Sequence, residues 1–166
     1  MFETERLSIR PWSLDDASEF FAMYSNEEVV HFLPGMRPDS IDDQIVRMER
    51  VIERDRARGD GTGAFTCRLL SNGRLVGSAL LKGLPGHDLI EVGWHLDRWA
   101  WGQGFASEMG GCMLTHGFET LGLEYIVAVV DPLNERSKRV ALRIGMEPRA
   151  TIRAYDKDLD CFEKFR

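Results

Sequence analysis

A short glycine-rich segment offers backbone groups, more than side chains, for binding a ligand. Residues 99–108 read Trp-Ala-Trp-Gly-Gln-Gly-Phe-Ala-Ser-Glu, follow an apolar stretch and open a predicted helix. Gly102, Gly104 and Ala106 carry little or no side chain, so a ligand can approach the main chain closely. Successive N–H groups at the positive end of a helix dipole form a concave anion site. The segment therefore predicts a pyrophosphate site, and a simple turn from strand to helix is the alternative.

The spacing within this segment differs from that of a dinucleotide-binding loop. Such a loop reads G-x-G-x-x-G and usually lies in the first strand-to-helix turn of a doubly wound sheet. Here the pattern is G-x-G-x-A over residues 102–106, and it comes after several predicted strands. The spacing argues against a Rossmann-type site.

The preceding predicted strand, residues 89–96, carries two side chains that can exchange protons. Side chains alternate between the two faces of a strand. One face carries Glu91, Gly93 and His95, and the other carries Val92, Trp94 and Leu96. A carboxylate on a largely apolar strand is unusual unless it is exposed or functional, and histidine ordinarily titrates near neutral pH. Glu91 is the first candidate base and His95 the second; a salt bridge for Glu91 and a structural role for His95 are the alternatives.

The pattern of the whole chain predicts a mixed α/β fold that positions these segments. Expected strands are residues 7–10, 64–70, 75–81, 89–96 and 124–130, with two short strands in the tail from about residue 149. Expected helices are residues 13–24, 39–58, 104–121 and 134–144. Asn72-Gly73 marks a tight hairpin, and the helix 104–121 connects two strands in a β-α-β unit. We expect antiparallel hairpins around one parallel connection, in a single domain over residues 1–166.

Composition limits the classes of function. The 166 residues are 43% hydrophobic and 29% charged, with a net charge of -6. Such an acidic chain gains little from a nucleic-acid backbone, and no apolar run approaches the roughly 20 residues that span a membrane. The three cysteines form no C-x-x-C pair, which argues against a disulfide framework or a zinc site. We expect a cytoplasmic protein that uses no metal and binds neither nucleic acid nor membrane.

Several segments together resemble the GNAT N-acetyltransferase superfamily. Residues 101–106, Trp-Gly-Gln-Gly-Phe-Ala, match the later anchor positions of the superfamily's cofactor signature. Trp101 replaces the Gln or Arg that is usual at the first position, a replacement typical of the RimJ/RimL-like branch. Residues 4–12, 90–96 and 130–146 are similar to that branch's N-terminus, fourth strand and second cofactor motif. The resemblance extends over essentially the whole chain in the expected order.

The resemblance implies an α/β (α+β) fold, a cofactor and a reaction. The fold would be a mixed, mostly antiparallel sheet of about seven strands flanked by about four helices. Its fourth and fifth strands, residues 89–96 and 124–130, would splay apart, and acetyl-coenzyme A would pair with the backbone exposed in the gap. The acetyl group would pass directly to a primary amine of a protein N-terminus or a small molecule. A homodimer is compatible with the resemblance, and the alternative function is a non-catalytic acyl-CoA-binding module.

The resemblance also assigns residues to the cofactor. The implied cofactor-binding residues are Val92, Gly93, Trp94, Trp101, Gly102, Gln103, Gly104, Phe105, Ala106, Ser107, Asn134 and Ser137. Asn134 would bind the cofactor arm, with a helix N-cap as the alternative. Ser137 would protonate the leaving thiolate. Lys138, Arg139 and Arg143 are expected on a solvated helix face, with contact to the adenosine phosphate as the alternative.

Proton transfer and acceptor contacts complete the implied site. An ammonium has no lone pair, so the amine must lose a proton before it attacks. Glu91, directly or through a water, is expected to take that proton, ahead of His95. A backbone N–H near Val92 or Gly93 is the natural oxyanion donor. The expected acceptor contacts are Phe32, Leu33 and Glu91.

Overall fold

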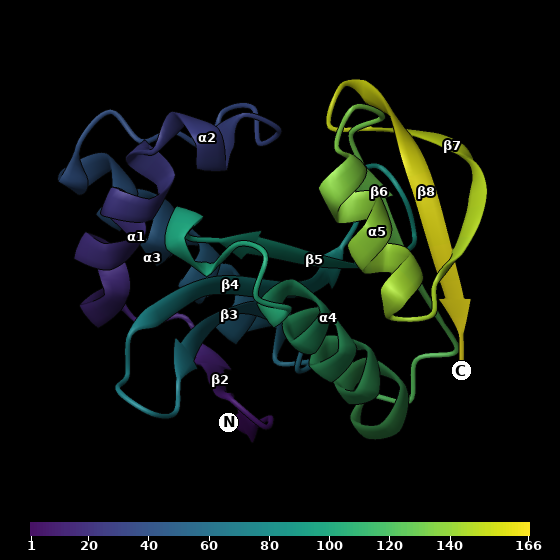
Figure 1. Ribbon diagram of the computed structural model, residues 1–166, viewed down its shortest axis with the longest axis horizontal. Coiled ribbons are helices and arrows are strands. Elements are labelled where there is room, and N and C mark those ends of the chain that lie inside the picture. The colour runs from purple at the N-terminus through teal and green to yellow at the C-terminus, as the bar shows by residue number, and fades with distance from the viewer.

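The computed structural model describes residues 1–166 and contains one eight-stranded sheet (Figure 1). The strands lie in the order β1-β2-β3-β4-β5-β6-β8-β7. Their bounds are β1 Phe2–Glu3, β2 Leu7–Pro11, β3 Gly63–Leu69, β4 Leu75–Gly83, β5 Ile90–Leu96, β6 Tyr125–Val130, β7 Glu147–Ala154 and β8 Lys157–Phe165. All neighbouring pairs are antiparallel except β5 and β6. The expected mixed, mostly antiparallel sheet is confirmed.

Helices cover both faces of this sheet (Figure 1). Their bounds are α1 Ala17–Ser25, α2 Glu27–Val30, α3 Ile41–Arg58, α4 Phe105–Thr115 and α5 Glu135–Arg143. A π-helix, His116–Thr120, continues α4. The ends of α3 follow from local chemistry: Ser40 Oγ accepts the Asp43 N–H at the start, and Gly59 ends the helix with a left-handed φ of 61°.

Two groups of buried apolar side chains hold the layers together. The larger group packs α4 against the sheet and includes Met109 and Met113 of the helix and Val92 of β5. A smaller group packs α1 and α3 through Phe20 and Met48. Because helices cover the central strands on both sides, β3 and β4 have long runs of buried residues.

The parallel strands β5 and β6 meet at only one position of the ladder, where Glu91 lies opposite Val127. On its other side β5 pairs continuously with β4, from Gly83 opposite Ile90 to Gly77 opposite Leu96. Beyond Glu91, β5 therefore parts from β6, and backbone groups on its open edge have no strand partner. This is the splay expected for residues 89–96 and 124–130.

Three details differ from the sequence-based expectation. Phe2–Glu3 forms an additional strand because it pairs with β2, and the short helix α2 was not expected. The tail strands are longer than expected and turn at Tyr155 and Asp156, because β8 is paired on both sides, with β6 and with β7. None of the helices combines the length and the apolar character required to cross a bilayer.

Candidate functional site

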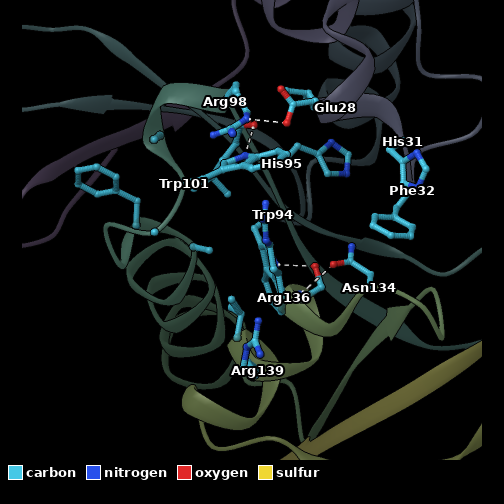
Figure 2. A pocket seen from close by; sticks show the side chains of 18 of the residues that line it. Glu28, His31, Phe32, Trp94, His95, Arg98, Trp101, Asn134, Arg136 and Arg139 are labelled. Carbon is cyan, nitrogen blue, oxygen red and sulfur yellow. Dashed lines mark hydrogen bonds and ion pairs between the residues drawn. The ribbon is translucent and has the colours of Figure 1, made fainter.

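Two cavities open beside the gap between β5 and β6. The first has a volume of about 1140 Å³ and lies between the start of α4 and α5. The second has a volume of about 820 Å³ and lies among α1, α3, β5 and the β7–β8 turn. The residues that line both are Phe32, Leu33, Trp94, His95, Asn134 and Ser137. Figure 2 shows Trp94 and His95 in the middle of this group, with Phe32 and Asn134 beside them. The cavities therefore adjoin at the splayed strands.

The loop before α4 carries free backbone donors at the first cavity. Gly102 and Gly104 have left-handed φ angles of 76° and 84°, which glycine adopts without strain. No side chain caps α4, and the first N–H groups of a helix have no acceptor within it. From outside the cavity, Arg6 donates to the Gln103 carbonyl at 2.9 Å and pairs with Glu108 at 2.6 Å. This clamp engages the carbonyl side of the loop and leaves its N–H groups free.

Ser137 lies where the two cavities meet, and its hydrogen bonds determine whether its hydroxyl can donate a proton. The Trp94 indole Nε1 donates to Ser137 Oγ at 3.3 Å. Since an indole N–H can only donate, Ser137 Oγ is the acceptor and its own proton stays available. Asn134 Oδ1 accepts the Ser137 backbone N–H at 3.1 Å and so caps α5. The N-cap geometry expected as one alternative for Asn134 is confirmed, and it leaves the side-chain N–H₂ group free.

Glu91 is 6% exposed in the wall of the second cavity and is held by two donors. Lys82 Nζ lies 2.6 Å from Glu91 Oε1, and the Tyr155 hydroxyl donates to the same oxygen. Burial, followed by the Glu91 charge, raises the pKa of Tyr155, so this hydroxyl is a donor at neutral pH. Glu91 Oε2 accepts no hydrogen bond within the chain. The carboxylate is therefore fixed through one oxygen and has the other free.

His95 faces both cavities but is engaged with a neighbour. Its Nδ1 lies 3.0 Å from the Tyr24 hydroxyl of α1. Burial, with a smaller contribution from the Lys82 charge, lowers the pKa of His95 to about 4. The imidazole is therefore neutral above about pH 5 and is a weak proton acceptor. This geometry favours Glu91 over His95 as the base.

Comparison with known proteins identifies the family. Residues 6–147, most of the chain, match the acetyltransferase (GNAT) domain. The chain belongs to the GNAT acetyltransferase family. Both the resemblance noted in the sequence and the expectation of an N-acetyltransferase are confirmed at this level.

Individual GNAT relatives agree in sequence and in fold. The chain is 31% identical to the uncharacterised N-acetyltransferase YoaA of Bacillus subtilis, over 93% of this chain and 87% of that protein. An acetyltransferase structure from Agrobacterium tumefaciens is similar with a TM-score of 0.85 at 24% identity, over 99% of this chain and 94% of that one. RimL, the ribosomal L7/L12 α-N-protein acetyltransferase solved with coenzyme A, has a TM-score of 0.83 at 14% identity, over 98% and 95% of the two chains. RimJ/RimL-like proteins are thus among the structural neighbours of this GNAT fold.

The first cavity has the groups that a GNAT protein needs to hold coenzyme A. Ser107 is among the residues that line it, and its Oγ is buried without any hydrogen-bond partner. Arg139 and Arg143 of α5 also line it and make no ion pair within the chain. An unpartnered buried hydroxyl is costly unless a ligand satisfies it, and uncompensated guanidinium groups favour phosphates. With the free N–H groups of the loop, these residues fit a diphosphate and a further phosphate.

Trp101 forms part of the wall of the same cavity. Its ring contacts the guanidinium groups of Arg98 at 4.7 Å and Arg136 at 4.9 Å, measured to the ring centroid. Its Nε1 donates to the Leu96 carbonyl at 3.1 Å, and Arg98 is paired with Glu28 at 2.9 Å (Figure 2). Trp101 therefore links the end of β5 with α2 and α5 around the cavity mouth.

The structure brings most of the expected site residues together. Those that line the first cavity are Trp94, Trp101, Gly102, Gly104, Phe105, Ala106, Ser107, Asn134 and Ser137. Those that line the second are Phe32, Leu33, Glu91, Val92, Gly93, Trp94, His95, Asn134 and Ser137. Gln103 lines neither cavity, because its side-chain amide turns back to donate to the Trp99 carbonyl at 2.8 Å.

Sequence reasoning missed three residues that contact the expected bases. Lys82 could have been found, because β4 and β5 are consecutive antiparallel strands and their register places it opposite Glu91. Tyr24 and Tyr155 lie far from β5 in the sequence, on α1 and in the β7–β8 turn. Tyr155 has a φ of 52°, a conformation that is uncommon for a non-glycine residue. No local sequence pattern predicts the contact of Tyr24 with His95 or that of Tyr155 with Glu91.

Proposed function

We propose that the chain transfers an acetyl group from acetyl-coenzyme A directly to a primary amine. The observation that carries this proposal is the meeting of the two cavities beside the splayed strands. A thioester held in the first cavity and an amine held in the second would face each other near Trp94 and Ser137. Fixing two reactants in one geometry removes much of the entropic part of a reaction barrier.

The first cavity would bind the cofactor mainly through N–H donors. The N–H groups of residues 102–106 and the Ser107 hydroxyl would bind the diphosphate, and Arg139 and Arg143 the remaining phosphate. The open edge of β5 beyond Glu91 would pair with the pantetheine arm, as an added strand does. When bound, acetyl-coenzyme A supplies an acyl group activated as a thioester.

On the acceptor side, Glu91 would take the proton from the amine, directly or through one water. Lys82 and Tyr155 hold Oε1, so Oε2 would accept the proton without moving the side chain. Ser137 would give its hydroxyl proton to the leaving thiolate of coenzyme A. Its Oγ already accepts a hydrogen bond from the Trp94 indole, so the hydroxyl proton stays available. Proton acceptor and proton donor would then lie on opposite sides of the gap.

Thiol release tests the proposal. Acetyl-coenzyme A is incubated with a panel of primary amines, and free thiol is measured from pH 6 to 10. Glu91→Gln should lower kcat about 100-fold and leave coenzyme A affinity, measured by calorimetry, unchanged. Glu147→Gln, on the exposed edge strand β7, is the matched control and should behave as wild type. An unchanged rate in Glu91→Gln would remove this residue from proton transfer.

The alternative function, a non-catalytic acyl-CoA-binding module, makes an opposite prediction. Such a module would bind coenzyme A with an affinity that depends on Gly104 and Ser107 but would release no thiol with any amine. Glu91→Gln would then have no effect in either assay. The free Glu91 Oε2 and the available Ser137 proton favour the enzyme.

A further inference from the structure

Most of the charged residues that line the second cavity are paired. The cations are Arg54, Lys82 and Lys157, and the carboxylates are Glu91, Asp131 and Asp156. Lys82 pairs with Glu91 at 2.6 Å, and Lys157 pairs with Asp131 at 3.1 Å. Of the three carboxylates only Asp156, which is exposed in the β7–β8 turn, has no cation partner within the chain. Arg54 pairs at 2.7 Å with Asp55, which does not line the cavity. The two less exposed carboxylates of the wall, Glu91 and Asp131, therefore each have a lysine partner.

The remaining wall of this cavity is largely apolar. Of its 26 lining residues, 15 are hydrophobic. Aromatic and aliphatic side chains come from several elements: Trp12, Tyr24, Phe32, Leu33, Met36 and Val51. Such a surface gains from covering hydrocarbon or aromatic groups, and its volume of about 820 Å³ suits a small molecule.

We infer that the acceptor is a small primary amine with one amino group and an apolar, aliphatic or aromatic body. The inference rests on the proposed function and narrows its acceptor. The apolar body lies against the wall formed around Phe32 and Val51, and the amino group points to Glu91. A second ammonium would lose water beside a wall in which Glu91 and Asp131 are already paired with lysines, and only the exposed Asp156 could compensate part of this loss. Polyamines and aminoglycosides are therefore poor acceptors.

A matched pair of amines tests the inference. Hexylamine and hexane-1,6-diamine have the same chain length and differ only in the second amino group. Calorimetry measures the binding of each to the protein saturated with coenzyme A, and thiol release measures kcat/KM. Hexylamine should exceed the diamine by about tenfold or more in both measurements. 2-Phenylethylamine should resemble hexylamine, and a short peptide with a free N-terminal alanine should resemble the diamine.

Two lysine substitutions test the role of charge balance. Lys157→Met removes the partner of Asp131 and exposes a carboxylate to the cavity. It should shift the preference toward the diamine by about three- to tenfold. Lys138→Met is the matched control, because Lys138 pairs with Asp160 at 2.8 Å and lies outside the cavity. It should leave the preference unchanged.

The outcomes separate this inference from the function on which it rests. Equal or better use of the diamine or the peptide, with thiol release intact, overturns the inference and keeps the proposed function. Preferential binding of hexylamine without thiol release for any amine keeps the inference about the cavity and overturns the function. An equal shift in Lys138→Met and Lys157→Met overturns the role assigned to charge balance.

Discussion

At the scale of single residues, hydrogen-bond direction separates side chains that can exchange a proton from those that cannot. The Trp94 indole fixes Ser137 Oγ as an acceptor, and the donors on Glu91 occupy one oxygen only. His95 is bonded to Tyr24, and its lowered pKa keeps it neutral. The three side chains that the sequence offers for proton transfer thus differ in what they can do.

Ser137→Ala removes a proton donor while keeping α5 capped, because the cap uses the Ser137 backbone N–H. We expect kcat to fall about ten- to 100-fold with coenzyme A affinity within about twofold of wild type. Ser107→Ala should give the opposite pattern, a weaker coenzyme A affinity with a smaller change in kcat, because its hydroxyl lies at the loop. Steady-state kinetics and calorimetry on both variants measure the contrast; the same pattern in both would contradict the assigned roles.

The pH dependence of the rate should contain no contribution from His95. Its pKa is lowered to about 4, so it stays neutral through the range in which the enzyme is assayed. His95→Asn retains a polar atom near the position of Nδ1 and can keep the hydrogen bond to Tyr24. The acidic limb of the kcat/KM profile should have the same apparent pKa in wild type and His95→Asn. A displaced or missing limb in the variant would return His95 to proton transfer.

At the scale of elements, the strand-loop-helix unit from β5 to α4 carries most of the proposed cofactor site. The loop can present its N–H groups because both glycines adopt left-handed φ angles and because Arg6, far away in sequence, holds the loop from outside. The open edge of β5 exists because β6 leaves it after a single pairing. The site therefore depends on the local glycines of the loop, on the long-range contact from Arg6 and on the separation of β6 from β5.

Gly104→Val should abolish coenzyme A binding. The left-handed φ of 84° disfavours a β-branched residue, and its Cβ would lie 3.4 Å from Arg6 in the clamp. Gly86→Val is the control, because Gly86 has a similar φ of 79° in an open turn. Both should lose about 1–2 kcal/mol of unfolding free energy, measured by urea denaturation. Only Gly104→Val should lose affinity in calorimetry; retained affinity would remove the loop from the site.

At the scale of the whole molecule, an ionic network joins the acceptor side of the fold to the sheet. Asp16, 1% exposed at the start of α1, accepts from Arg10 at 2.6 Å, Arg68 at 2.8 Å and Thr66 at 2.7 Å. These donors come from β2 and β3, whereas α1 carries Tyr24 of the second cavity. Burial alone would raise the pKa of Asp16, but the hydrogen bonds outweigh it and lower the pKa.

The stability of the fold should therefore depend on Asp16 and on pH. A lowered folded-state pKa stabilises the protein above the ordinary value of 3.8, and this stabilisation is lost as the pH falls through the folded-state pKa. Asp16→Ala should lower the unfolding free energy at pH 7 by about 3 kcal/mol. Asp15→Ala, an exposed neighbour, should change it by less than about 0.5 kcal/mol. Urea denaturation at pH 7 and pH 2 should also show a smaller acid-induced loss in Asp16→Asn than in wild type.

Much of the element order could be predicted because its signals are local. The Asn72-Gly73 turn, the apolar stripe of α3 and the glycines before α4 each act within a few residues of the chain. The full lengths of β7 and β8 could not be predicted, because their pairing with each other and with β6 is long-range. Arg139 and Arg143 are exposed on α5, as expected for a solvated helix face, and the position of α5, which no local pattern encodes, makes them line the first cavity as well.

The sequence by itself determined the family, the glycine-rich loop before α4 and the alternation that places Glu91 and His95 on one face of β5, because these depend on residue order and strand or helix period. The tertiary structure decided which of those two side chains is free to act, since Tyr24 and Tyr155 reach them from α1 and from the β7–β8 turn. It also decided that the second cavity has a largely apolar wall in which Glu91 and Asp131 are paired with lysines. Charge pairing and burial depend on distances between chain segments that no local pattern encodes.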